Sequence, residues 1–182
     1  MLFIALTAAF SVLAWVPQAI WGGRRDLRMA MRHGMAAAFL FTGVDHFLNT
    51  TAHYVPMMPD FLAPWDRELI WVSGAGEIAG AIGLVVPPRA YARLGLPNLR
   101  AWAAIGLALM LCVLVIANIN VAINGGTYGG VEVNRLYLWL RPFLQPLIIV
   151  WALYAGGVIG TRRPRGARES VGRGSVPRPR SS

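Results

Sequence analysis

The sequence contains no lysine, a single cysteine and few charged residues of either sign. Only 14% of its 182 residues are charged, whereas a soluble domain normally has about 25%. The lone thiol, Cys112, excludes a disulfide within the chain and argues against internal thiol redox chemistry. The net charge of +9 comes from arginine alone, with eight acidic side chains opposing it.

The signatures of soluble enzymes are also missing. The chain has no phosphate-cradling glycine loop, no HExxH zinc motif, no CxxC pair and no nucleophile elbow. Its three histidines fall at different expected depths, and His33 belongs at the opposite end from His46 and His53. No metal site is therefore expected, and whether the protein is an enzyme stays open.

Long apolar runs dominate what is present. Hydrophobic residues make up 56% of the chain, and the mean hydropathy is +0.52. A helix needs ~20 mostly apolar residues to cross a bilayer. The stretches of about this length are 1–21, 34–50, 68–86, 101–123 and 138–160. They predict an all-α fold, a transmembrane helical bundle. The first stretch lacks the basic start of a signal peptide, so we expect a retained helix.

The connecting segments alternate in charge. Residues 22–33 and 87–100 each carry a net charge of +3, and residues 161–182 carry +6. Residues 51–67 carry −1, and residues 124–137 are neutral. Because arginine-rich loops stay on the cytoplasmic side, this pattern predicts five crossings, with the N-terminus outside and the C-terminus in the cytoplasm.

The segment 161–182 combines seven arginines with proline, glycine and serine and has no apolar periodicity. This composition predicts a disordered cytoplasmic tail. Arginines clustered beside a membrane attract anionic lipid headgroups, which are the expected partners of the tail. Charge alone would also suit a nucleic-acid arm, but no other feature supports one, so no nucleic-acid partner is expected.

Polar residues inside the apolar segments are predicted to converge on the outer half of the membrane. Glu77 lies in the third segment, within SGAGEIAGAIG. A carboxylate in hydrocarbon costs roughly 2.5 kcal/mol or more, so it needs partners. At a rise of 1.5 Å per residue, the other helices deliver polar groups to the same layer. Those groups are His46, Asn118, Arg141 and Gln145.

Small residues surround Glu77. Gly76 and Gly80 form a small-xxx-small pair that lets a neighbouring helix approach. The spacing of Ser73, Glu77 and Gly80 puts them on one helix face, so Glu77 is predicted to point into the bundle. A buried network of this kind either fixes helix register without doing chemistry or forms a ligand site, and the residues alone favour neither.

The loop 49–67, NTTAHYVPMMPDFLAPWDR, contains three prolines, which exclude a long helix. Its aromatic and apolar side chains require apolar contacts, so we expect it to lie flat on the outer surface above the polar residues. It is either a lid over a site or an interfacial belt with no ligand beneath it.

Five segments, in order, resemble the DoxX family of small bacterial membrane proteins: GVDHF (43–47), YVPMMPDFLAP (54–64), SGAGEIAGAIGLVVPPR (73–89), ANINVAI (117–123) and LRPFLQPLIIVWALY (140–154). The matching motif positions are His46, Phe47, Pro59, Leu62, Gly74, Glu77, Asn118, Arg141, Gln145 and Pro146. Two departures are Asp45 before the histidine and the absence of a proline before Asn118.

The resemblance implies a bacterial inner-membrane protein with a DoxX-like four-helix membrane domain, here residues 34–160. An extra N-terminal transmembrane helix with a basic cytoplasmic loop would form residues 1–33, and the arginine-rich tail 161–182 would follow the domain. These three regions are the expected domain organisation.

Some members of that family are linked to thiosulfate:quinone oxidoreduction or to membrane redox complexes. The resemblance therefore implies a quinone-linked accessory or subunit, with quinone as the expected cofactor. His46 and Glu77 are the candidate catalytic residues, because an imidazole and a carboxyl can exchange protons. The candidate cofactor-binding residues are Phe47, Asn118, Arg141 and Gln145. The chain has no evident flavin, haem or iron–sulfur ligand set, so electrons would come from a redox-protein partner.

Two other functions stay open. One is a non-catalytic membrane scaffold or assembly partner whose polar cluster is structural. The other is a solute or proton pathway, since intramembrane Glu and His recur in relays. The inner halves of the predicted helices are almost wholly apolar, which argues against a continuous path.

Overall fold

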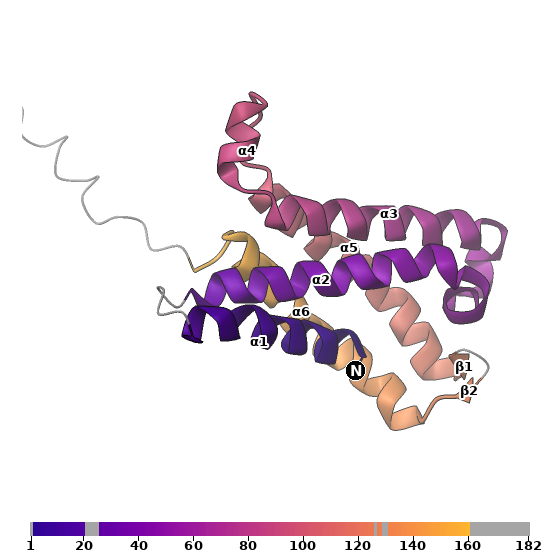
Figure 1. Cartoon of the computed structure of the whole chain (residues 1–182). Coiled ribbons are helices and arrows are strands. Elements are labelled where there is room, and N and C mark those ends of the chain that lie inside the picture. Colours follow the sequence, from indigo (N-terminus) through magenta and orange to yellow (C-terminus); the bar gives the residue numbers. More distant parts are fainter. Residues whose placement is uncertain (1, 21–25, 126, 129–130, 161–182) are drawn as a thin grey trace, which may run out of the picture.

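The chain folds into long antiparallel helices in a computed structural model that describes residues 2–20, 26–125, 127–128 and 131–160 (Figure 1). The arginine-rich tail predicted at 161–182, with its lipid contacts, lies outside the described residues. Within them, the long α-helices are α1 (Leu2–Ile20), α2 (Leu27–Leu48), α3 (Asp66–Val85), α5 (Arg100–Asn124) and α6 (Arg135–Gly156). The all-α prediction is confirmed.

Short elements occupy the connections. The segment between α2 and α3 forms a π-helical turn, η1 (Thr50–Tyr54), and two 3₁₀ helices, η2 (Val55–Met57) and η3 (Asp60–Trp65). The short helix α4 (Pro88–Arg93) links α3 to α5. An antiparallel pair of two-residue strands, β1 (Thr127–Tyr128) and β2 (Val131–Glu132), links α5 to α6. The prolines thus exclude a long helix between α2 and α3, as the sequence predicts.

Four helical segments among the described residues are long and apolar enough to cross a membrane: Phe3–Ile20, Asp60–Val85, Arg100–Asn124 and Arg135–Gly156. The sequence predicted five crossings, and the helix that covers the second one, α2, falls short. Charged and histidine side chains at both of its ends, such as Arg32 and Asp45, lower its hydropathy. Even so, α2 is 22 residues long, about 33 Å, and packs in the same layer as its neighbours.

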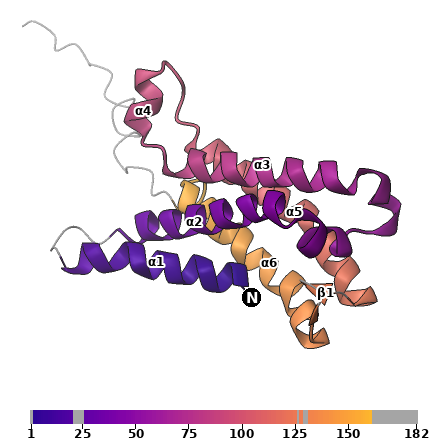
Figure 2. The same ribbon diagram turned by 45° about the vertical axis from the view of Figure 1, so that its right-hand side comes forward.

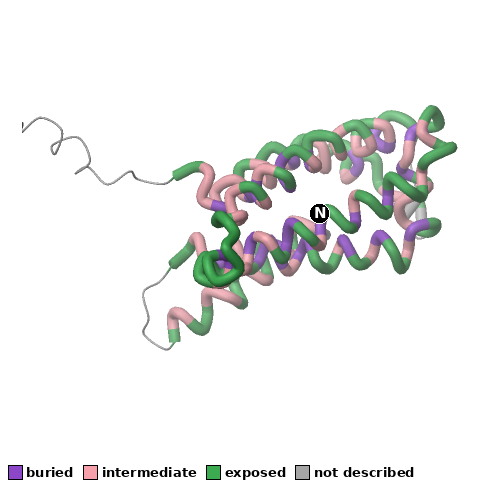
Figure 3. Tube along the Cα trace, turned by 90° about the horizontal axis from the view of Figure 1, so that it is seen from above, coloured by how far each residue is buried: buried purple, intermediate pink, exposed green. Residues whose placement is uncertain are grey.

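The helices α2, α3, α5 and α6 pack in a closed ring, in which α2 contacts α3 and α6, and α5 contacts the same two helices. Helix α1 lies along the outside of α2 (Figures 1 and 2). Along each long helix, buried residues alternate with exposed ones (Figure 3). Large apolar side chains such as Val72, Phe143 and Trp102 are exposed, which suits contact with lipid.

The ring is tightest at the end where α3 and α6 finish. A Cβ atom built on Gly156 of α6 would lie 2.1 Å from the Cβ atom of Ala104 on α5, so the two helices nearly touch. Two arginines satisfy helix-end carbonyls there: Arg32 donates to the Ala155 carbonyl oxygen (2.9 Å), and Arg100 donates to the Leu84 carbonyl oxygen (2.9 Å). At the opposite end, α5 and α6 slope away from α2 and α3 (Figures 1 and 2).

Candidate functional site

A cavity of about 980 Å³ lies between the helices on the side where they diverge. Side chains from the four ring helices line it, together with the start of α1 and the segment between α2 and α3. Five of the six residues predicted from the sequence border this cavity: His46, Glu77, Asn118, Arg141 and Gln145. The structure therefore joins residues from four helices at a hollow space, as a ligand site requires.

Glu77 belongs to the wall of the cavity that is built by α2 and α3. Its side chain is only 4% exposed and points into the bundle, as the helical spacing predicted. The hydroxyl of Thr42 on α2 donates to Glu77 Oε2 over 2.5 Å. Gly80, one turn further along α3, packs directly on Leu107 of α5 and leaves no room for a side chain. The carboxyl is thus buried, held by one α2 hydroxyl and open to the cavity.

His46 lies one helical turn further out on α2 than Thr42, and it is also 4% exposed. Its Nδ1 lies 3.3 Å from Ser73 Oγ on α3, one turn further out than Glu77. The Ser73 hydroxyl also donates to the Ile70 carbonyl oxygen, and the tautomer of the imidazole sets which group donates in the His46–Ser73 contact. In the neutral ring, one nitrogen carries a proton and the other can accept one.

Two glycines let α2 and α3 approach closely beside the site. A Cβ atom on Gly74 would lie 2.7 Å from the Cβ atom of His46 and 2.9 Å from the Gly43 carbonyl oxygen. A Cβ atom on Gly43 would lie 2.9 Å from the Gly74 carbonyl oxygen and 3.1 Å from the Cβ atom of Glu77. The backbones therefore meet at the level of both candidate catalytic residues. The predicted pair, Gly76 and Gly80, faces α5 instead.

The opposite wall comes from α5 and α6. Gln145 is 3% exposed and donates to the Leu111 carbonyl oxygen over 2.5 Å. Its Oε1 accepts a 2.8 Å hydrogen bond from Asn118 Nδ2. Arg141 lies one turn further out on α6 and borders the same cavity. Gln145 and Asn118 thus tie α5 to α6, while both also contribute polar atoms to the cavity wall.

Polar side chains line the middle of the cavity, and apolar side chains line both its floor and its outer end. His46 and Arg141 lie in the outer tier, and Glu77 and Gln145 lie one turn deeper on their helices. Below them the lining is formed by Phe3, Phe39, Met110 and Ile148. The polar residues therefore line a column about two turns deep rather than a single thin layer. Such a space suits an amphipathic molecule with a polar head and an apolar remainder.

The segment Thr50–Trp65, named here the lid segment, covers the outer end of the cavity. Tyr54, Met57, Met58, Phe61 and Leu62 of this segment border the cavity. Met57 is buried and packs against Val121, Ala122 and Leu138, so it connects the lid segment to α5 and α6. The lid segment thus bridges the two diverging helix pairs, which agrees with the position expected for the loop 49–67.

Phe47 does not join the other candidates. It is 46% exposed and lies beside a separate, smaller hollow with Trp71 and Arg67. Trp71 donates through Nε1 to Thr50 Oγ1 over 3.1 Å. Phe47 follows His46 directly, so a helix turns it about 100° away from the cavity. The aromatic side chain that does contact His46 is Tyr54, whose ring meets the imidazole edge-on with centroids 4.0 Å apart.

Sequence reasoning missed Thr42 as a partner of Glu77. The sequence did contain an indication, because Thr42 precedes His46 by four residues and the two side chains therefore share one face of the helix. Among the described residues, no three histidine, cysteine, aspartate or glutamate side chains lie close enough to hold a metal ion.

Comparison with known proteins gives one family. Residues 35–155, which include every residue of the cavity wall outside α1, match the family described as "Domain of unknown function (DUF8561)". Neither the curated proteins nor the solved structures give a significant match to the chain.

Proposed function

The chain belongs to the DUF8561 family of domains of unknown function, and from that premise we propose that it is a membrane protein that binds a quinone headgroup in its central cavity. The observation that carries this proposal is the cavity itself, which brings His46, Glu77, Asn118, Arg141 and Gln145 around a partly open hollow with an apolar floor. A cluster that only fixed helix register would fill that space with its own contacts.

The proposed location is a bacterial inner membrane. In this arrangement the arginine-rich end of the bundle faces the cytoplasm, and the lid segment faces outward. Four apolar helices support membrane insertion, and the neutral or acidic connections lie at the end opposite to the arginines. The cavity then occupies the outer half of the bilayer, and its lipid-facing neighbours keep water from the apolar floor.

Each polar residue has a proposed role. Arg141, with the amides of Asn118 and Gln145, donates hydrogen bonds to the carbonyl oxygens of the ring. His46 and Glu77 exchange the protons that a quinone takes up on reduction and releases on oxidation. Reduction of a quinone to a quinol needs two protons and two electrons. The chain provides proton-exchanging groups, and a redox-protein partner provides the electrons.

In this proposal the ring of α2, α3, α5 and α6 corresponds to a DoxX-like four-helix core, with α1 as the additional N-terminal helix. The packing supports this division, because α1 lies outside the ring along α2. The scaffold alternative receives support from the contacts between helices. Gln145 bonds to both Asn118 and Leu111 of α5, and Thr42 of α2 bonds to Glu77 of α3, so these side chains tie helices together as well as line the cavity.

Purified protein extracted in mild detergent is expected to carry about one quinone per chain, because the cavity shields the headgroup from the micelle and satisfies its carbonyl oxygens. Organic-solvent extraction followed by chromatography and mass spectrometry measures both the oxidised and the reduced form. An unrelated membrane protein from the same host, prepared in the same detergent, gives the background. Quinone at the background level in both forms would contradict the proposal.

A further inference from the structure

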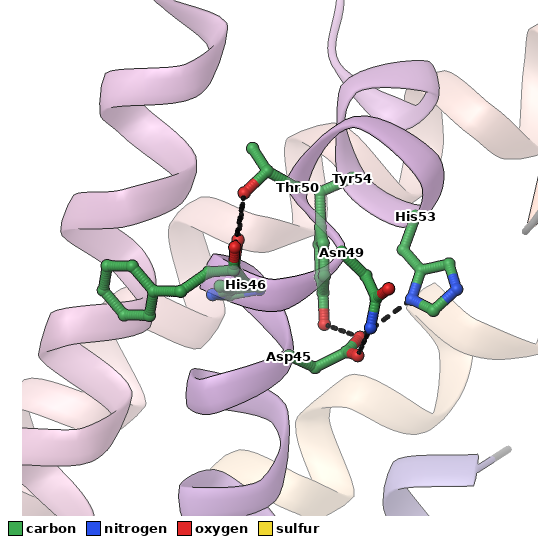
Figure 4. Close-up of polar contacts among 7 residues, drawn as sticks. Asp45, His46, Asn49, Thr50, His53 and Tyr54 are labelled. Atoms are coloured by element: carbon green, nitrogen blue, oxygen red, sulfur yellow. Dashed lines mark hydrogen bonds and ion pairs between the residues drawn. The ribbon is translucent and has the colours of Figure 1, made fainter.

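The outer end of α2 contains a polar cluster that the proposed proton chemistry does not use. Asp45 Oδ2 accepts hydrogen bonds from His53 Nδ1 (2.9 Å) and from the Tyr54 hydroxyl (2.9 Å), and Oδ1 accepts one from Asn49 Nδ2 (2.5 Å). Figure 4 shows these three side chains converging on one carboxylate. Asp45 does not border the cavity, but Tyr54 does.

The cluster holds η1 in a fixed position relative to α2. His53 and Tyr54 belong to η1, whose π-helical turn begins at Thr50, one residue beyond the end of α2. A π-helical turn is rare and is frequently found at functional sites. With Asp45 as a common acceptor, both η1 side chains are drawn back over the last turn of α2. The backbone turn and the carboxylate therefore set the position of the lid segment together.

Tyr54 transmits this position to the site. Its hydroxyl is held by Asp45, and its ring packs edge-on against the imidazole of His46 at a centroid distance of 4.0 Å. The other side of His46 is closed by α3, where Gly74 lies against the Cβ atom of the histidine. His46 is therefore enclosed between a rigid helix crossing and one tyrosine ring from the lid segment.

From this geometry we propose that Asp45 is a positioning residue of the cavity: it holds the Tyr54 hydroxyl so that the ring covers His46 and closes the outer end of the site. This proposal rests on the proposed function only for the identity of the ligand, because the Tyr54 ring also covers His46 when no ligand is bound. Without the Asp45–Tyr54 hydrogen bond, the ring moves off His46 and the ligand exchanges through the outer end.

Tyr54→Phe tests the closure, since it removes the hydroxyl and keeps the ring. The readout is the rate at which diethyl pyrocarbonate modifies His46 in the full-length protein without added ligand, with each histidine resolved by peptide mass spectrometry. A rise of about tenfold is expected, because that factor corresponds to ~1.4 kcal/mol and lies near the worth of a hydrogen bond to a charged group. Tyr91→Phe is the matched control, because Tyr91 is buried at the other end and donates to the Gly83 carbonyl oxygen over 3.0 Å.

Variants of Asp45 distinguish a specific effect on the position of the Tyr54 ring from a general loosening of the protein. Asp45→Ala is expected to raise the modification rate at least as much as Tyr54→Phe, because it removes the acceptor of the Tyr54 hydroxyl together with those of His53 and Asn49. Adding Tyr54→Phe to Asp45→Ala should raise the rate no further, since the Tyr54 hydroxyl has already lost its acceptor. Asp45→Asn keeps an acceptor for the tyrosine hydroxyl and should restore much of the protection. Equal His46 rates in Tyr54→Phe and wild type would overturn the proposal, as would an equal rise in Tyr91→Phe.

A ligand measurement distinguishes this proposal from the proposed function. If quinone binds, its dissociation from Tyr54→Phe should be several-fold faster than from Tyr91→Phe. If His46 becomes reactive as expected but no variant binds quinone, the closure stands and the quinone assignment fails. If quinone binds and dissociates at the same rate from both variants, the quinone assignment stands and the role of Asp45 is rejected.

Discussion

Replacement of Glu77 by glutamine is expected to reduce the quinone retained by the purified protein about tenfold. The side chain keeps its size but loses the carboxylate that exchanges a proton with the bound ring, and a hydrogen bond to a charged group is worth ~1.5–3 kcal/mol, or tenfold and more in affinity. Glu77 has no substitute nearby on α3, where Ser73 and Gly80 are its face neighbours. The loss is measured by titrating the purified variant with quinone and then following the dissociation of quinone from the protein in detergent.

Two controls make the result specific. Glu68→Gln changes an exposed carboxylate on the same helix and should leave retention unchanged. The thermal unfolding temperature of Glu77→Gln should not fall below that of wild type, because glutamine has the same size and keeps an oxygen that accepts from the Thr42 hydroxyl. Equal retention by the two variants would show that Glu77 is structural and does not contact a ligand.

Gly74→Ala is expected to lower the free energy of unfolding by ~1–3 kcal/mol or more, because overpacking forces helices apart. The new Cβ atom would lie 2.9 Å from the Gly43 carbonyl oxygen, and a backbone atom cannot rotate away as a flexible side chain can. The separation of α2 from α3 would also displace His46 from Ser73. Thermal unfolding in detergent measures the stability, and His46 reactivity reports the displacement.

Gly106→Ala is the matched control for this substitution. Gly106 lies in α5, and a Cβ atom there would meet no other atom within 4 Å. Alanine in a helix interior is favoured over glycine by roughly 0.5–1 kcal/mol, so this variant should be as stable as wild type or more so. A Gly74→Ala protein that unfolds at the same temperature as Gly106→Ala would contradict the close crossing.

The helices and most of the candidate site could be predicted from the sequence because both depend on local patterns. Apolar length located α1, α3, α5 and α6 to within a few residues, and helical spacing pointed Glu77 inward. Depth along each helix then placed Asn118, Arg141 and Gln145 near the same cavity. For α2 (Leu27–Leu48), the apolar stretch 34–50 indicated only the later part of the helix, because charged side chains occupy its first turns.

The pairings could not be predicted, since they depend on how helices rotate and cross. Nothing in the sequence distinguishes the glycine that faces α2, Gly74, from Gly76, which faces α5. The same uncertainty concealed the hydrogen bond between Thr42 and Glu77. The π-helical turn also brings the ring of His53 to Asp45, a contact that the sequence did not indicate. That turn has no sequence signature of the kind that marks helix caps or proline turns.

The central claim is that the buried polar column faces a ligand cavity inside the membrane, and photoaffinity labelling with an azidoquinone tests it most directly. Membranes containing the protein are irradiated, and the labelled peptides are identified by mass spectrometry. Labelling of the lining residues Met57, Met110 and Tyr137 is predicted, with suppression by excess unlabelled quinone and in Glu77→Gln. Labelling confined to outward-facing residues such as Val72 and Phe143, and unchanged in that variant, would contradict the account.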